Sequence, residues 1–87
     1  NKGRPVFKTS IYRVDDIDVD GEPLELSLMD LSCGMIVIVD ITYGDLEKLN
    51  DESIKEGSII ATTLMSIPNN LEVTAEWRVT GGFRKVG

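Results

Sequence analysis

Hydrophobic and polar residues alternate along several short segments of the chain, which is the pattern of strands with one buried and one exposed face. The segment 71–80 alternates most regularly, and its inward set is predicted to be Leu71, Val73, Ala75, Trp77 and Val79. Residues 23–29 carry a leucine at every second position, and residues 58–67 are rich in β-branched side chains. Each of these three segments therefore predicts a strand.

The first predicted strand, residues 6–19, contains a change in its alternation. Its apolar residues fall on two different parities, namely Ile11, Ile17 and Val19 on one and Tyr12 and Val14 on the other. A bulge or a switch of sheet near Asp15 would reconcile the two sets. Asp20-Gly21 follows and predicts a tight two-residue turn, because both central residues of such a turn need positive φ.

The middle of the chain predicts a buried strand followed by a short helical connection. Residues 35–43 begin with five apolar residues on both parities, which is typical of a strand covered on both faces. Asp45 is a suitable helix N-cap, and Leu46 and Leu49 lie three residues apart. We expect one or two helical turns within residues 45–56, ended by Gly57.

These elements predict one α+β domain over residues 1–87, predominantly antiparallel β, as a five- or six-stranded small barrel or roll. The helical connection leading into residues 54–60 is loosely similar to oligonucleotide-binding barrels, but the pattern occurs in many unrelated folds and indicates no homology. Gly81-Gly82 is expected to end the last strand. Residues 83–87 then form either a short edge strand or a mobile tail, and residues 1–5 form a second basic end.

Charge is distributed unevenly along the chain. The net charge is −6, yet 13 of the 15 acidic residues lie within residues 15–56, together with only Lys48 and Lys55. The remaining seven of the nine basic residues lie toward the two ends. This layout either steers a partner by charge or balances itself when the terminal strands pair. The basic ends allow single-stranded nucleic-acid binding as an alternative function, although the net negative charge repels phosphate and disfavours it.

Composition excludes several kinds of chemistry. The chain has one cysteine, Cys33, and no histidine, so an intramolecular disulfide and a Cys/His zinc site are both impossible. The commonest general base and a phosphate-binding glycine loop are also missing, so we expect no enzyme activity. The longest apolar run, residues 35–39, is too short to cross a membrane. A single cysteine fits a reducing cytoplasm, and Cys33 is expected to be an inert small residue that thiol reagents label slowly.

The most distinctive motif is the acidic segment around the predicted first turn. Asp16, Asp18, Asp20 and Gly21 are spaced like the opening of a helix-loop-helix calcium loop, but Ser27 stands where that loop needs glutamate. A hairpin turning at Asp20-Gly21 would instead cluster carboxylates on its outer face and at its tip. The candidate ligands for a weak Ca²⁺ site, with Mg²⁺ less suited, are Asp16, Asp18, Asp20, Glu22 and Glu25.

The same segment has a second interpretation as an acidic face that is only solvated. With catalysis disfavoured, the sequence predicts a small non-enzymatic binding domain. A protein partner is expected because separated charge and a free strand edge both suit docking.

Overall fold

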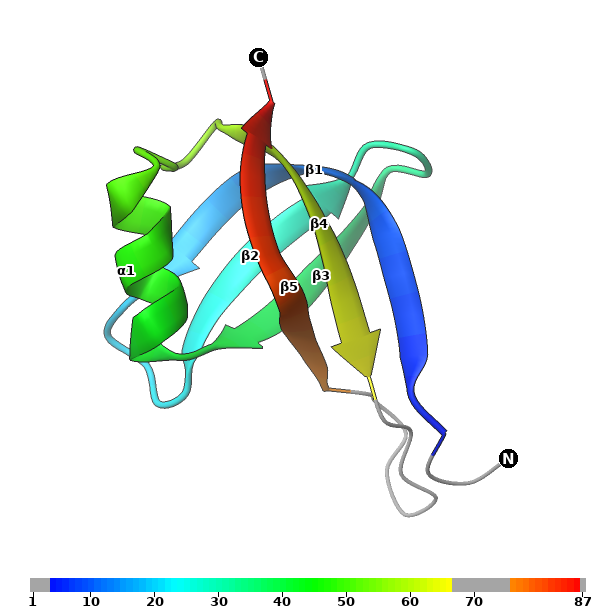
Figure 1. Ribbon diagram of the computed structural model, residues 1–87, viewed down its shortest axis with the longest axis horizontal. Coiled ribbons are helices and arrows are strands. Elements are labelled where there is room, and N and C mark those ends of the chain that lie inside the picture. The colour runs from blue at the N-terminus through cyan, green and yellow to red at the C-terminus, as the bar shows by residue number, and fades with distance from the viewer. Residues whose placement is uncertain (1–3, 67–75, 87) are drawn as a thin grey trace.

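A computed structural model describes residues 4–66 and 76–86, which form five strands and one short helix (Figure 1). In chain order the elements are β1 (Val6–Asp18), β2 (Leu24–Asp30), β3 (Met35–Ile41), α1 (Tyr43–Asp51), β4 (Ile59–Ser66) and β5 (Trp77–Val86). No helix among these residues is long and apolar enough to cross a membrane.

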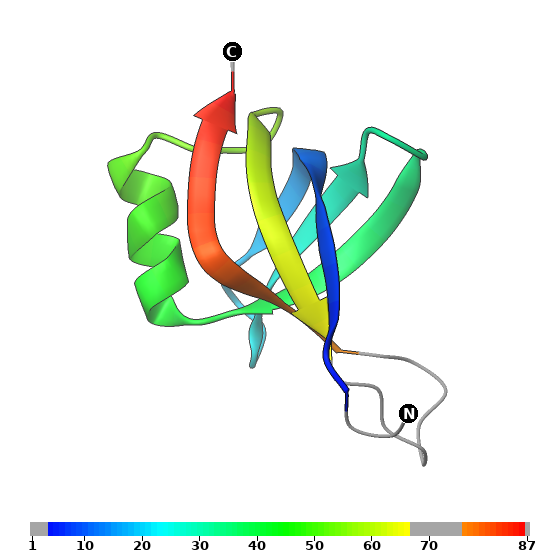
Figure 2. The ribbon, with the colours of Figure 1, turned by 45° about the vertical axis from the view of Figure 1, so that its right-hand side comes forward.

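The strands close into a ring in the order β1-β2-β3-β5-β4. All neighbours are antiparallel except β3 and β5, which run parallel where Val39 and Asp40 meet Trp77 and Arg78. β1 is long and strongly curved, so its first half pairs with β4 and its second half pairs with β2 (Figures 1 and 2). The predicted β-rich α+β fold with antiparallel strands and one helical connection is confirmed.

The core fills the ring and follows the alternation of the sequence. The register of β1 against β2 shifts between Val14 and Asp16, which is the predicted bulge near Asp15. This shift lets Tyr12 and Val14 point inward while Ile17 still packs against the core. The fully buried side chains include Tyr12, Val14, Leu26, Leu28, Val39, Leu49, Ile60 and Leu64.

α1 closes one side of the ring and contacts β3 and β5. The helix begins one turn earlier than predicted, because Thr42 and not Asp45 is its N-cap. The Thr42 hydroxyl accepts from the Asp45 amide at 3.1 Å, and the Asp45 carboxylate accepts from the Thr42 amide at 2.9 Å. This reciprocal capping box satisfies two amides that a helix start leaves free. The helix ends at Asp51, well before Gly57, and buries Leu49.

The turn between β1 and β2 differs from the prediction. A two-residue turn at Asp20-Gly21 would place Val19 opposite Glu22, whereas the observed register pairs Asp18 with Glu25. Residues 19–23 form a longer loop, in which the Asp18 carboxylate accepts from the amides of Asp20 at 3.0 Å and Gly21 at 3.1 Å. The local hydrogen bonds of Asp18 stabilise this wider turn.

Two predictions about the later strands are wrong. β3 was expected to be covered on both faces, but Met35, Ile36 and Ile38 are exposed. β5 does not end at Gly81-Gly82, and Phe83–Val86 continue to pair with β4 inside the ring. Trp77 packs against the core as predicted. The part of the predicted inward set before Trp77 lies outside the described residues.

Candidate functional site

The outer surface of β1, β2 and β3 is the candidate site, and it divides into an apolar half and an acidic half. Neighbouring strands place their outward side chains in rows across the three strands. From the apolar end to the acidic end these rows are Arg13-Met29-Ile36, Asp16-Ser27-Ile38 and Asp18-Glu25-Asp40. We call this surface the docking face.

The apolar half of the docking face centres on the hairpin between β2 and β3. Ile36 is 52% exposed and Ile38 is 48% exposed, and both lie on the outer side of β3. Leu31 and Met35 at the hairpin tip are also exposed, with 45% and 62% of their surfaces in water, although Met35 has the same parity as the inward Val37. Adjacent apolar side chains left in water on one face mark an interaction surface more often than isolated ones do.

The acidic half is a row of three carboxylates. Asp18 pairs with Glu25, and Glu25 pairs with Asp40, so the three side chains are direct cross-strand neighbours. Like charges at about 5 Å destabilise a sheet, and a positively charged group placed over them relieves that repulsion. On the β5 side Asp40 pairs with Arg78, an exposed arginine 4.0 Å from Glu76. Asp40, Asp45 and Arg78 line a cavity of about 600 Å³ beside the start of α1.

The predicted calcium ligands are only partly brought together. Asp16, Asp18 and Glu25 share the docking face as expected, whereas Asp20 and Glu22 lie beyond the strand ends in the loop 19–23. Within residues 4–66 and 76–86, no three Asp, Glu or Cys side chains form a group that could hold a metal ion. Calcium binding at this hairpin stays a prediction.

A buried carboxylate, which the sequence reasoning missed, anchors the hairpin tip. Asp30 is 1% exposed, and its Oδ1 accepts from the Ser32 hydroxyl at 2.6 Å, the Ser10 hydroxyl at 2.7 Å and the Ser32 amide at 2.9 Å. The pKa of Asp30 lies far below its ordinary value, chiefly because the Ser32 hydroxyl donates to its carboxylate. Burial opposes this effect, and the Ser10 hydroxyl, the Ser32 amide and the Lys8 charge add to it. The available signal was an aspartate two residues before a serine in a turn.

β1 supplies two further side chains that bear on this anchor. The Lys8 ammonium lies 3.5 Å from Asp30 Oδ2, and the Tyr12 hydroxyl donates to the Lys8 carbonyl at 3.0 Å. Burial, followed by the nearby Asp30 charge, raises the pKa of Tyr12 to about 12. The hairpin tip is therefore tied to β1 by an ionised, hydrogen-bonded network that holds one geometry.

Arg13 forms the boundary between the apolar half and the bulge. Its Nε donates to Asp15 Oδ1 at 2.6 Å, and its Nη2 lies 3.6 Å from the Met29 sulfur. The hydrogen bond to Asp15 raises the pKa of Arg13 above its ordinary value. Arg13 is thus already paired and covers Met29 with its side chain.

Cys33 is exposed in the turn after Asp30, so the expectation of slow labelling rests on its chemistry and gains nothing from burial.

Comparisons of the chain with models of protein families, with curated proteins and with solved structures find no match.

Proposed function

We propose that this protein is a non-enzymatic binding domain that docks a protein partner on the docking face. The observation that carries the proposal is the exposure of Ile36 and Ile38 on a strand with no charged residue before Asp40. Each isoleucine still has about half of its surface in water. Covering such a side chain contributes roughly 1 kcal/mol to association.

The two halves of the face specify the chemistry of the partner. Its contact surface combines apolar side chains, which cover Ile36 and Ile38, with lysine or arginine placed over Asp18 and Glu25, the two carboxylates of the row that do not pair with Arg78. A second copy that docks through this same face fits less well, because Arg13 is the one basic residue in the outward rows of β1, β2 and β3 and is already paired with Asp15. The expected partner is therefore a different, basic and apolar segment.

The arrangement of the strands supports the same face. A five-stranded ring in the order β1-β2-β3-β5-β4 is the arrangement of oligonucleotide-binding barrels, in which the outer face of the second and third strands binds ligands. This analogy identifies a face and leaves the ligand open. Nucleic acid suits this face poorly, because Glu25 and Asp40 repel phosphate and neither β2 nor β3 contains an aromatic residue for stacking.

A model peptide of alternating valine and lysine tests the proposal, with a valine-glutamate peptide as its counterpart. A fluorophore attached to Cys33, which is exposed at the hairpin tip, reports binding directly. We expect the lysine peptide to bind more tightly at low salt than at high salt and the glutamate peptide not to bind.

Two variants with similar exposure provide the matched control. Ile38 is 48% exposed on the docking face, and Val6 is 47% exposed at the start of β1, outside it. Ile38→Thr should weaken peptide binding about fivefold, which corresponds to roughly 1 kcal/mol, whereas Val6→Thr should leave it unchanged. Thermal unfolding of both variants checks that the fold is intact. Equal affinities for the two variants would contradict the proposal.

A further inference from the structure

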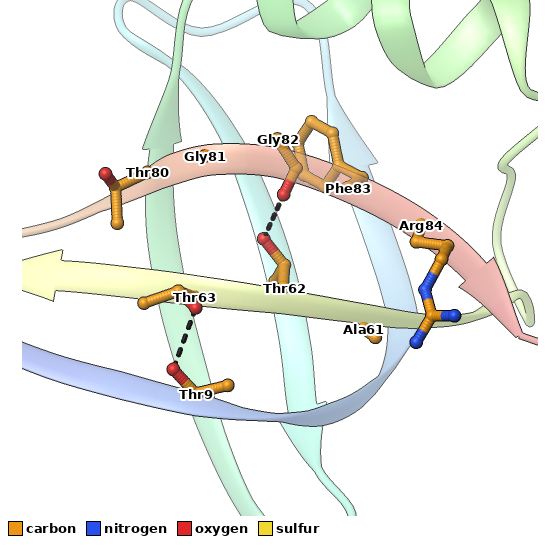
Figure 3. A pocket seen from close by; sticks show the side chains of 9 residues that line it. All are labelled: Thr9, Ala61, Thr62, Thr63, Thr80, Gly81, Gly82, Phe83 and Arg84. Carbon is orange, nitrogen blue, oxygen red and sulfur yellow. Dashed lines mark hydrogen bonds between the residues drawn. The ribbon is translucent and has the colours of Figure 1, made fainter.

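A second surface, formed by β4, β5 and the first half of β1, has a different chemistry. Outward threonines form one row across three strands, because Thr9 of β1 pairs with Thr63 of β4 and Thr63 pairs with Thr80 of β5. The Thr9 and Thr63 hydroxyl oxygens lie 2.8 Å apart (Figure 3). One of their two protons makes this hydrogen bond, so the pair keeps one proton to donate to a ligand.

A two-residue bulge in β5 opens a groove beside this row. Thr62 pairs with Phe83 and Thr63 pairs with Thr80, so Gly81 and Gly82 have no partner in β4. Both glycines have positive φ, at 82° and 90°, and a Cβ added at either position would meet nothing within 4 Å. The Thr62 hydroxyl donates to the Gly82 carbonyl at 2.7 Å and fixes the bulge.

The resulting groove has a volume of about 300 Å³ and is bordered by one cation. Arg84 extends from β5 toward β4 above Ala61, at the end of the groove away from Thr80 (Figure 3). Among residues 4–66 and 76–86, no carboxylate lies within ion-pair distance of the Arg84 guanidinium. Its donors are therefore available to a ligand.

The strand segments around the groove carry no acidic residue. The sequences 6–14, 59–66 and 77–86 contain neither aspartate nor glutamate, although the whole chain has a net charge of −6. Arg78 and Arg84 of β5 pair with Met65 and Ala61 of β4, on either side of the Thr63–Thr80 pair. This face is therefore locally positive on an acidic protein, which favours anions at close range.

We propose that this groove binds a phosphate group. The Arg84 guanidinium presents planar paired donors that match two phosphate oxygens, and hydroxyl donors of the threonine row reach a third oxygen. The glycines keep the strand open, so a tetrahedral group can approach the backbone closely. This inference is independent of the docking face, which lies on the second half of β1 with β2 and β3, whereas the groove lies on the first half of β1 with β4 and β5.

A titration with sodium phosphate, followed by amide NMR at constant ionic strength, tests the groove. We expect saturable shifts confined to Thr9, Thr63 and residues 80–84, and none when sodium chloride replaces phosphate. Arg84→Gln should weaken binding about tenfold, as expected for the loss of a charged, bidentate donor. Thr63→Val, which keeps the shape but removes the hydroxyl, should weaken it about threefold.

Arg78→Gln is the matched control, because Arg78 lies on the same strand and carries the same charge but does not line the groove. We expect the phosphate affinity of Arg78→Gln to stay within about twofold of the wild-type value. Equal losses in Arg84→Gln and Arg78→Gln would show a general charge effect and overturn the proposal. Flat spectra with phosphate would also overturn it.

The phosphate group can come from a free phosphorylated molecule or from the backbone of a single-stranded nucleic acid. Short oligothymidylate provides the second arm of the experiment. If it shifts the same amides, competes with phosphate and binds more tightly, the groove is a contact for a nucleic-acid backbone. If phosphate binds and the oligonucleotide does not, the groove takes a small phosphorylated molecule.

Discussion

Replacing Asp30 with asparagine tests whether one buried carboxylate holds the tip of the docking face in place. The change keeps the size of the side chain and removes its charge. The Ser10 and Ser32 donors then face a neutral acceptor, in place of the ionised oxygen they now contact at 2.6 to 2.9 Å. The Lys8 ammonium, 3.5 Å away, loses the anion opposite it.

The expected loss of unfolding free energy is about 3 kcal/mol. Hydrogen bonds to a charged group contribute roughly 1.5 to 3 kcal/mol each, but the asparagine oxygen retains part of each bond. Breaking a buried ion pair by removing one partner costs roughly 3 to 5 kcal/mol, and Lys8 is partly exposed, which places the effect at the low end. In a domain of this size, 3 kcal/mol lowers Tm by about 15 °C.

Urea unfolding followed by Trp77 fluorescence measures the loss. Asp15→Asn is the control, because Asp15 also pairs with a basic residue, Arg13, but remains partly exposed, and the urea midpoint of this variant should change little. Amide exchange at Ser32, Cys33 and Gly34 should rise in Asp30→Asn beyond the global change. A midpoint equal to that of Asp15→Asn would refute the view that the Asp30 charge anchors the hairpin.

The pH dependence of stability gives an independent check that the pKa of Asp30 is lowered and not raised. The folded pKa of Asp30 is lowered, so its contribution is fully present above the ordinary aspartate pKa of about 4. It is lost as the pH falls below that value, because the unfolded chain takes up the proton first. The wild-type protein should therefore lose stability more steeply than Asp30→Asn below about pH 4. Identical slopes would contradict the lowered pKa.

The remaining predictions concern three other features. Tyr12 should ionise only near pH 12, so stability should fall above about pH 10, where the unfolded tyrosine ionises. An ultraviolet titration in which all tyrosine is ionised by about pH 11 would contradict this. Cys33 should label to completion in the native state without denaturant, and a thiol that needs unfolding to react would show it to be covered. A titration with calcium up to about 1 mM, followed at the amides of residues 16–25, decides between the predicted weak site, which gives saturable shifts there, and a solvated acidic face, which gives none.

Much of the fold follows from the sequence because alternation reports burial directly. The bulge in β1 was predictable from the clash of parities between Tyr12 and Ile17. The prediction of a two-residue turn was wrong for a local reason. The Asp18 carboxylate accepts from two loop amides and stabilises a longer turn than the sequence motif indicates. The predicted helix start was wrong for a similar reason. Thr42 and Asp45 are both suitable N-cap residues, and the capping box that they form together makes Thr42 the N-cap.

The candidate site could be predicted only in part. A run of apolar residues on both parities, as in Met35–Ile38, is the same whether its second face is covered by the chain itself or left exposed. The sequence could not decide between these outcomes, because the distinction depends on which strands lie over β3. The row from Asp18 to Asp40 depends on the register of three strands, and Asp40 was not among the candidate calcium ligands predicted from the sequence.

The bulge at Gly81-Gly82 also restricts how the length of β5 can change. Side chains on a strand alternate, so Phe83 points to the core and Arg84 to solvent only while the insertion before them is even. Deleting both glycines would preserve that arrangement, whereas deleting one would turn a guanidinium inward and an aromatic ring outward. Viable insertions and deletions at this point of the chain should therefore come in pairs of residues.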